Sequence, residues 1–132
     1  MANSSGLAKH VLWSDWRERF IMKDNAHYQG SKAPTPEFLE TLDKVMPDIL
    51  AGQDFVYLFP SPLAWGGLHM EWRLADVPIE FDLEWAIDTG EMHIWAFHLG
   101  TMDCAAEDRI DAKSNIPEEI RKFVEAQKIK VM

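Results

Sequence analysis

The sequence has a single cysteine, Cys104, and no apolar run close to the roughly 20 residues that cross a bilayer. One cysteine excludes an internal disulfide and a zinc-thiolate cluster, which fits a reducing compartment. The start, MANSSGLAKH, lacks the basic and apolar segments of a secretion signal, so we expect a cytoplasmic protein without a membrane partner. Positive charge is also scarce, with 13 Lys and Arg against 22 Asp and Glu. Direct binding to nucleic acid is disfavoured, because it depends on cations that neutralise phosphates.

Apolar and aromatic side chains are abundant. Hydrophobic residues make up 47% of the 132 residues, and the chain contains 6 Trp. This content excludes disorder of the whole chain, and the length suits one domain over residues 1–132. The net charge of −9 is concentrated in residues 67–112, which hold 11 acidic and 2 basic side chains. A partner that this segment contacts is therefore expected to be basic.

Apolar residues recurring every three to four positions predict three helices. The first spans about Leu7 to Lys23. The second follows Thr35, whose hydroxyl suits an N-cap, and begins at Pro36, where a missing N–H costs nothing. The third follows Ser114 or Asn115 as its cap and ends in a basic segment, as the helix dipole favours.

Alternation with a period of two predicts strands. Aromatic and β-branched residues at 55–59 form the first strand, which the prolines after it are expected to stop. Residues 68–74 and 79–85 alternate cleanly between apolar and charged side chains, so each strand has one buried and one outward face. Pairing Leu74 with Ile79 across a short loop sets the apolar residues of both strands opposite one another.

The turn after residue 85 decides which side chains of the fourth strand are buried. A two-residue loop turns Trp95 and Phe97 onto the charged face, whereas a three-residue loop with a left-handed Gly90 buries both. We therefore expect the three-residue loop. Residues 101–114 alternate weakly and are expected to form a loop. The predicted fold is α+β, with two N-terminal helices, a four-stranded antiparallel meander sheet and a C-terminal helix.

Charged side chains meet on the outward face of this sheet. The register places Glu71 beside Asp82 and His69 beside Glu84. Such a group fits a hard cation or an acid/base pair, but solvated strands commonly carry charges, and no motif fixes ligand geometry here. We expect no catalytic residue, no bound metal and no cofactor. The residues expected to contact a partner are acidic side chains of this face and the next hairpin, with one loop tryptophan: Glu71, Glu80, Asp82, Glu84, Asp88, Glu91 and Trp65.

A local pattern over residues 62–98 carries a resemblance. Gly66-Gly67-Leu68-His69-Met70-Glu71-Trp72 is a Gly-Gly-apolar-x-x-Glu-Trp strand, and an acidic alternating strand and the hairpin Asp88-Thr89-Gly90-Glu91 follow it. This order resembles small uncharacterised bacterial proteins, some of which occur near toxin and antitoxin genes. The resemblance implies a sheet and brings no established activity.

These observations favour a non-catalytic acidic protein that masks a basic surface of a protein partner. An antitoxin, an immunity protein or a phage-type inhibitor of a nucleic-acid-binding complex acts in this way. One alternative is an acidic secretion-type chaperone, which exposed apolar grooves and a homodimer would favour. The other is a metal-assisted hydrolase that uses the face of His69, Glu71, Asp82 and Glu84.

Overall fold

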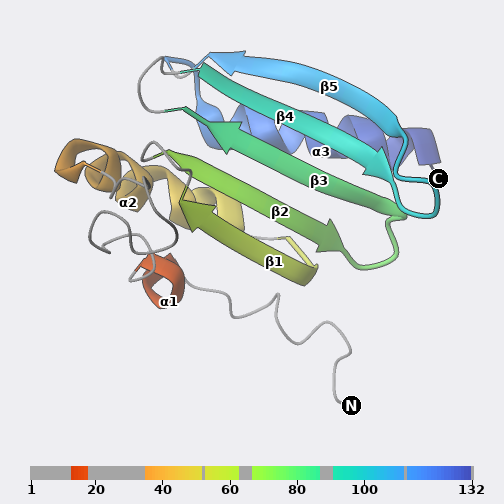
Figure 1. Ribbon diagram of the computed structural model, residues 1–132, viewed down its shortest axis with the longest axis horizontal. Helices are drawn as coiled ribbons and strands as arrows, with labels where there is room; N and C mark the ends of the chain where they lie inside the picture. The colour runs from red at the N-terminus through yellow and green to blue at the C-terminus, as the bar shows by residue number, and fades with distance from the viewer. Residues whose placement is uncertain are drawn as a thin grey trace, which may run out of the picture.

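A five-stranded sheet with helices on one face makes up the fold (Figure 1). The computed structural model describes residues 13–17, 35–51, 53–62, 67–86, 91–111 and 113–131. The strands are β1 (Phe55–Pro62), β2 (Leu68–Leu74), β3 (Ile79–Trp85), β4 (Glu91–His98) and β5 (Cys104–Asp111), paired antiparallel in chain order. The helices are α1 (Trp13–Arg17), α2 (Pro36–Leu50) and α3 (Ile116–Val131). The α+β class and the meander are as predicted, but the sheet has five strands and not four.

The helix caps follow the sequence signals. The Thr35 hydroxyl accepts a hydrogen bond from the Phe38 N–H at 3.2 Å at the start of α2, and Asn115 accepts one from Glu118 at 3.4 Å at the start of α3. Both caps are confirmed, with Asn115 and not Ser114 as the second. Of the helix predicted over residues 7–23, the structure describes α1 alone, and the rest lies outside the described residues.

One hydrogen-bonded carboxylate ties α1 to α2. Asp43 accepts bonds at 2.7 Å from the Trp13 indole N–H and from the Arg17 guanidinium. The Arg17 hydrogen bond is the main reason that the pKa of Asp43 lies below its usual value. Trp13 is buried, so this contact anchors α1 against the hydrophobic core.

The core lies between the sheet and the two long helices. On the sheet it consists of alternate residues of β2, β3 and β4, with Phe55 and Leu58 of β1 and Ile110 of β5. The most deeply buried large side chains of the sheet and of α2 are Trp72, Phe55, Phe81, Leu42, Met46, Leu68, Met70, Ile79, Leu83, Met92 and Ile94. Aromatic contacts join the layers. The Phe38 ring of α2 packs edge-on against Trp85, and the Phe123 ring of α3 packs edge-on against Phe81. These ring contacts join both long helices to the buried face of the sheet.

The register between β2 and β3 is the predicted one, whereas that between β3 and β4 is not. Trp72 lies opposite Phe81 and Glu71 opposite Asp82, as expected. Across the next turn the Ala86 N–H donates to Glu91, so Trp85 pairs with Met92 and the prediction of a three-residue loop is wrong. Met92, Ile94 and Ala96 form the buried row of β4, while Trp95 and Phe97 lie on the other face.

Packing explains this reversal. Ala96 lies directly opposite Phe81, whose ring also meets Phe123 of α3. A small side chain at residue 96 leaves room for both rings, and a bulky Trp95 or Phe97 in that row would overfill the same space. The aromatic residues of β4 are therefore on the outside of the sandwich.

Strand β5 replaces the loop that was predicted over residues 101–114. Its one buried apolar side chain is Ile110, and Glu107, Asp108 and Arg109 are exposed. An edge strand covered on only part of one face needs little apolar alternation, so its sequence resembles a loop.

Strand β1, at the other edge, also extends further than predicted. It continues through Pro60 to Pro62, beyond the expected end at Phe59. Proline tolerates an edge position because it has no N–H to place in a ladder. Among the described residues, no helix is long and apolar enough to cross a membrane.

Candidate functional site

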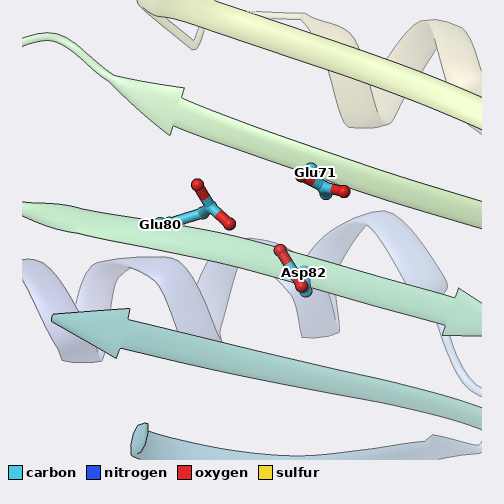
Figure 2. A group of neighbouring side chains, drawn as sticks. All are labelled: Glu71, Glu80 and Asp82. Carbon is cyan, nitrogen blue, oxygen red and sulfur yellow. The ribbon is translucent and has the colours of Figure 1, made fainter. Parts of the chain in front are cut away.

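Helices cover one face of the sheet, and the face turned away from them, here called the outer face, carries the polar side chains. Figure 2 shows the centre of the outer face, with the side chains toward the viewer and the helices behind the strands. Three rows run across it, because residues opposite one another on paired strands share a face. They are Tyr57, Arg73, Glu80 and Phe97; then Phe59, Glu71, Asp82, Trp95 and Glu107; then Ser61, His69, Glu84, His93 and Arg109.

A cluster of three carboxylates occupies the centre of the outer face. Oxygens of Glu71 from β2 and of Glu80 and Asp82 from β3 lie within 4.8 Å of one another (Figure 2). The predicted register is what brings these strands together, so this part of the candidate site is as expected. Glu84 and His69 are outside the cluster, although the His69 Nε2 is 4.0 Å from Glu71.

Arg73 neutralises one member of the cluster. Its Nε and Nη2 donate to the same Glu80 oxygen at 3.0 and 2.9 Å. Glu80 is only 7% exposed, so Arg73 compensates a carboxylate that is largely removed from water. The same guanidinium lies 5.3 Å from the centre of the Tyr57 ring. Arg73 therefore contacts Glu80 and Tyr57 and does not neutralise Asp82.

Asp82 is the member of the cluster whose ionised carboxylate its surroundings disfavour. Its Oδ1 is buried and has no hydrogen-bond partner. Burial is the main cause that raises its pKa to about 7, and repulsion from Glu71, Glu80 and Glu84 adds to it. Loss of solvation and nearby like charges both disfavour the ionised carboxylate. A cation placed beside Asp82 would relieve both effects.

Aromatic rings border the carboxylates on both sides. Phe59 of β1, 42% exposed, lies opposite Glu71, and Trp95 of β4 lies opposite Asp82. The Trp95 indole donates to Glu107 at 3.1 Å, which fixes the ring at this position, and the His93 ring packs edge-on against it. Trp95 and Phe97 were not expected at this site, because the predicted β3–β4 register placed them in the core. Both rows of β4 are apolar in the sequence, so its alternation alone does not show which row is buried.

The other predicted partner-contacting residues are spread out. Glu84 is exposed on the outer face beside His69 and His93. Glu91 lies at the end of β4, 3.9 Å from Arg109. Trp65 and Asp88 lie outside the described residues, so their roles stay predictions.

The chemistry of this arrangement is that of cation recognition. Carboxylate oxygens suit an ammonium or guanidinium group as well as a hard metal ion, and aromatic faces attract organic cations. Cys104 lies in the row of Phe97, at the far end from the carboxylates, and its thiol is near the Ala106 carbonyl at 3.5 Å. Among the described residues, no base is hydrogen-bonded to this thiol.

Comparisons with known proteins give no name to this arrangement. No family model matches the chain. No curated protein and no solved structure matches it either. The resemblance of residues 62–98 to small bacterial proteins therefore stays a prediction, and the function has to be argued from the outer face.

Proposed function

We propose that the protein is a non-catalytic binding module whose outer face covers a basic surface of a protein partner. The observation that carries this proposal is the central row, in which Glu71 and Asp82 lie between the rings of Phe59 and Trp95. Carboxylates bordered by aromatic rings complement lysine and arginine side chains through both charge and ring faces. An antitoxin, an immunity protein or a phage-type inhibitor would use such a face to occupy a site that normally binds phosphates.

Electrostatic imbalance supports the same function. Arg73 is engaged by Glu80, and Asp82 and Glu84 have no ion-pair partner among the described residues. Repulsion between these carboxylates costs free energy in the isolated protein, and a partner cation would recover it on binding. A partly buried carboxylate also gains more from a cation than a fully solvated one, because solvent screening is weaker there.

The test compares the wild type with a variant neutralised on the outer face, Glu71→Gln, Asp82→Asn and Glu84→Gln. A matched variant removes the same charges elsewhere: Glu40→Gln, Asp48→Asn and Glu125→Gln, all at exposed helix positions. Each is used as bait in host extract, after circular dichroism has established its fold. The proposal expects a basic protein captured by the wild type and the matched variant and lost by the outer-face variant. Equal capture by all three would place the contact elsewhere and overturn it.

The carboxylate cluster also favours a second candidate, the metal-assisted hydrolase. Three oxygens within 4.8 Å suit a hard divalent cation, and Glu80 would replace the expected His69 and Glu84 as a ligand. Calorimetric titration with Mn²⁺ and Mg²⁺ tests this candidate directly. It requires binding of one ion by the wild type and loss of that binding in Glu71→Gln, and absence of any binding heat rules it out.

A further inference from the structure

Neighbouring rows of the outer face have the same order of side-chain types from β1 to β4, with one difference. Each row has an aromatic ring on β1, a carboxylate on β3 and a second ring on β4. On β2 the first row has a cation, whereas the central row has an anion. The first row is Tyr57, Arg73, Glu80 and Phe97, and the central row is Phe59, Glu71, Asp82 and Trp95. The central row therefore lacks the cation that its neighbour has.

The first row shows how this surface holds a guanidinium group. The Nε and Nη2 of Arg73 both donate to one Glu80 oxygen, at 3.0 and 2.9 Å. The same guanidinium lies 5.3 Å from the centre of the Tyr57 ring. A carboxylate and an aromatic ring on the two neighbouring strands thus contact one planar cation.

The central row offers the same two kinds of contact. Asp82 lies directly opposite Trp95, and Glu71 lies directly opposite Phe59. The Trp95 indole donates to Glu107 at 3.1 Å, which holds the ring beside the carboxylate. Oxygens of Glu71 and Asp82 lie within 4.8 Å of each other. Because a guanidinium carries its N–H donors in one plane, a single group can donate to both carboxylates and still face a ring.

The cations of the outer face lie outside the central row. Of the arginines on the described strands, Arg73 belongs to the first row, and Arg109 is in the third row, 3.9 Å from Glu91. The histidines of this face, His69 and His93, are also in the third row and are cations only when protonated. The acidic side chains of the face outnumber these groups: they are Glu71, Glu80, Asp82, Glu84, Glu91, Glu107 and Asp111. An added cation is therefore complementary in charge to the central row.

We propose that the partner places an arginine side chain on the central row, beside Asp82 and Trp95, as Arg73 is placed in the first row. This inference rests on the proposed function and names the side chain that the basic partner uses there. Lysine is less suited, because its ammonium is a compact, strongly hydrated charge without a plane to lay on a ring. The Asp82 Oδ1 is already buried, so a cation beside it has to lose water, and a guanidinium is the more weakly hydrated group.

The probes are hexa-arginine and hexa-lysine peptides, which have the same length and the same charge. Calorimetry measures their affinities at pH 8, above the pKa of about 7 of Asp82, with a chelator present so that no divalent ion occupies the carboxylates. The inference expects the wild type to bind hexa-arginine about tenfold more tightly than hexa-lysine. Hexa-arginine should also shift the NMR signal of the Trp95 indole N–H more than hexa-lysine does.

Variants with the same change of charge locate this preference. Glu71→Arg gives the central row its own cation, at the position that Arg73 has in the first row. Glu84→Arg adds the same side chain in the third row, outside the carboxylate cluster. Both variants should bind both peptides more weakly, because each loses negative charge. Glu71→Arg should also reduce the preference for arginine to below about twofold, whereas Glu84→Arg should keep it.

Circular dichroism establishes the fold of each variant before the titrations. If Glu71→Arg does not fold, Trp95→Leu takes its place, since loss of the ring should reduce the preference to about threefold. A preference that stays at the wild-type value in the folded variant overturns the inference, because its origin then lies outside the central row.

The peptide pair also separates this inference from the proposed function. Equal affinity of the wild type for both peptides overturns the assignment of arginine and leaves an acidic face that accepts either cation, as the proposed function requires. Absence of binding by both peptides contradicts the outer face as a surface for cations and overturns the inference with it.

Discussion

Asp82 on β3 lies directly opposite Trp95 on β4. This pairing gives the outer face its character, because it sets a carboxylate with a raised pKa beside an aromatic ring. Phe59 and Glu71 extend the same row on the other side. An acidic sheet surface alone would suit solubility, whereas carboxylates between aromatic rings are suited to holding an organic cation.

The stability of the protein should depend on the ionisation of Asp82. Its pKa is raised from 3.8 to about 7, so between these values the folded protein holds a proton that the unfolded chain has released. The free energy of unfolding therefore falls as pH rises through this window and levels off above it. Asp82 is partly exposed, and after solvent screening we expect a loss of about 1–2 kcal/mol.

Asp82→Asn should abolish this part of the pH dependence. The variant should become more stable than the wild type as pH increases, and the free energies of unfolding of the two proteins should be closest at about pH 4. Urea unfolding at a series of pH values measures the difference, and Asp48→Asn on the exposed side of α2 is the control. A constant gap between wild type and Asp82→Asn from pH 4 to pH 8 would contradict the raised pKa.

The Arg73–Glu80 pair should contribute far more to the free energy of unfolding than an exposed ion pair does. Arg73→Gln leaves a nearly buried Glu80 carboxylate without its cation, and we expect a loss of about 2–3 kcal/mol in the free energy of unfolding. Adding Glu80→Gln should restore much of that loss, because the uncompensated charge is removed. The Arg121–Glu118 pair on α3 is the control, since both its side chains are about half exposed and its coupling should stay below about 0.5 kcal/mol. Similar coupling energies in the two double-mutant cycles would refute this difference.

The sequence predicts most of the carboxylate cluster, because β2 and β3 allow one register. Both strands alternate strictly, and a slip by one residue would turn every charged side chain toward the core. The turn between Leu74 and Ile79 is also short, so its length agrees with the alternation. Glu71, Glu80 and Asp82 are therefore placed correctly from the sequence alone.

The aromatic border of the site could not be placed in the same way. In β4 both faces are apolar, so burying Trp95 and Phe97 or burying Met92, Ile94 and Ala96 satisfies the same pattern. The choice depends on the volume between Phe81 and Phe123, which is a property of the packed layers. Strand β5 was missed for a related reason: an edge strand with one buried apolar residue has little periodicity to detect.

Gln127→Leu should stabilise the isolated protein. The substitution replaces a polar side chain that is only 4% exposed with an apolar one of similar size beside Phe123 and Ile110, which increases the apolar area buried on folding. We expect the free energy of unfolding to rise by about 1 kcal/mol, as read from urea unfolding. A decrease would indicate that hydrogen bonds of the amide in the folded protein outweigh the gain in apolar contact.

Trp95 should contribute to cation binding without contributing much to folding, because it lies outside the core cluster. A hexa-arginine peptide serves as the probe, and calorimetry at low and at high salt measures its affinity. Replacing the ring in Trp95→Leu should weaken binding by about three- to fivefold, the equivalent of 0.5–1 kcal/mol for one cation–ring contact at a partly exposed site. Salt should weaken the peptide's binding to both proteins by a similar factor, because the carboxylates are unchanged. Met102→Leu, at the exposed hairpin between β4 and β5, is the control and should bind as the wild type does. If Trp95→Leu also binds as the wild type does, the carboxylates act without the ring, and the outer face is an acidic surface and no more.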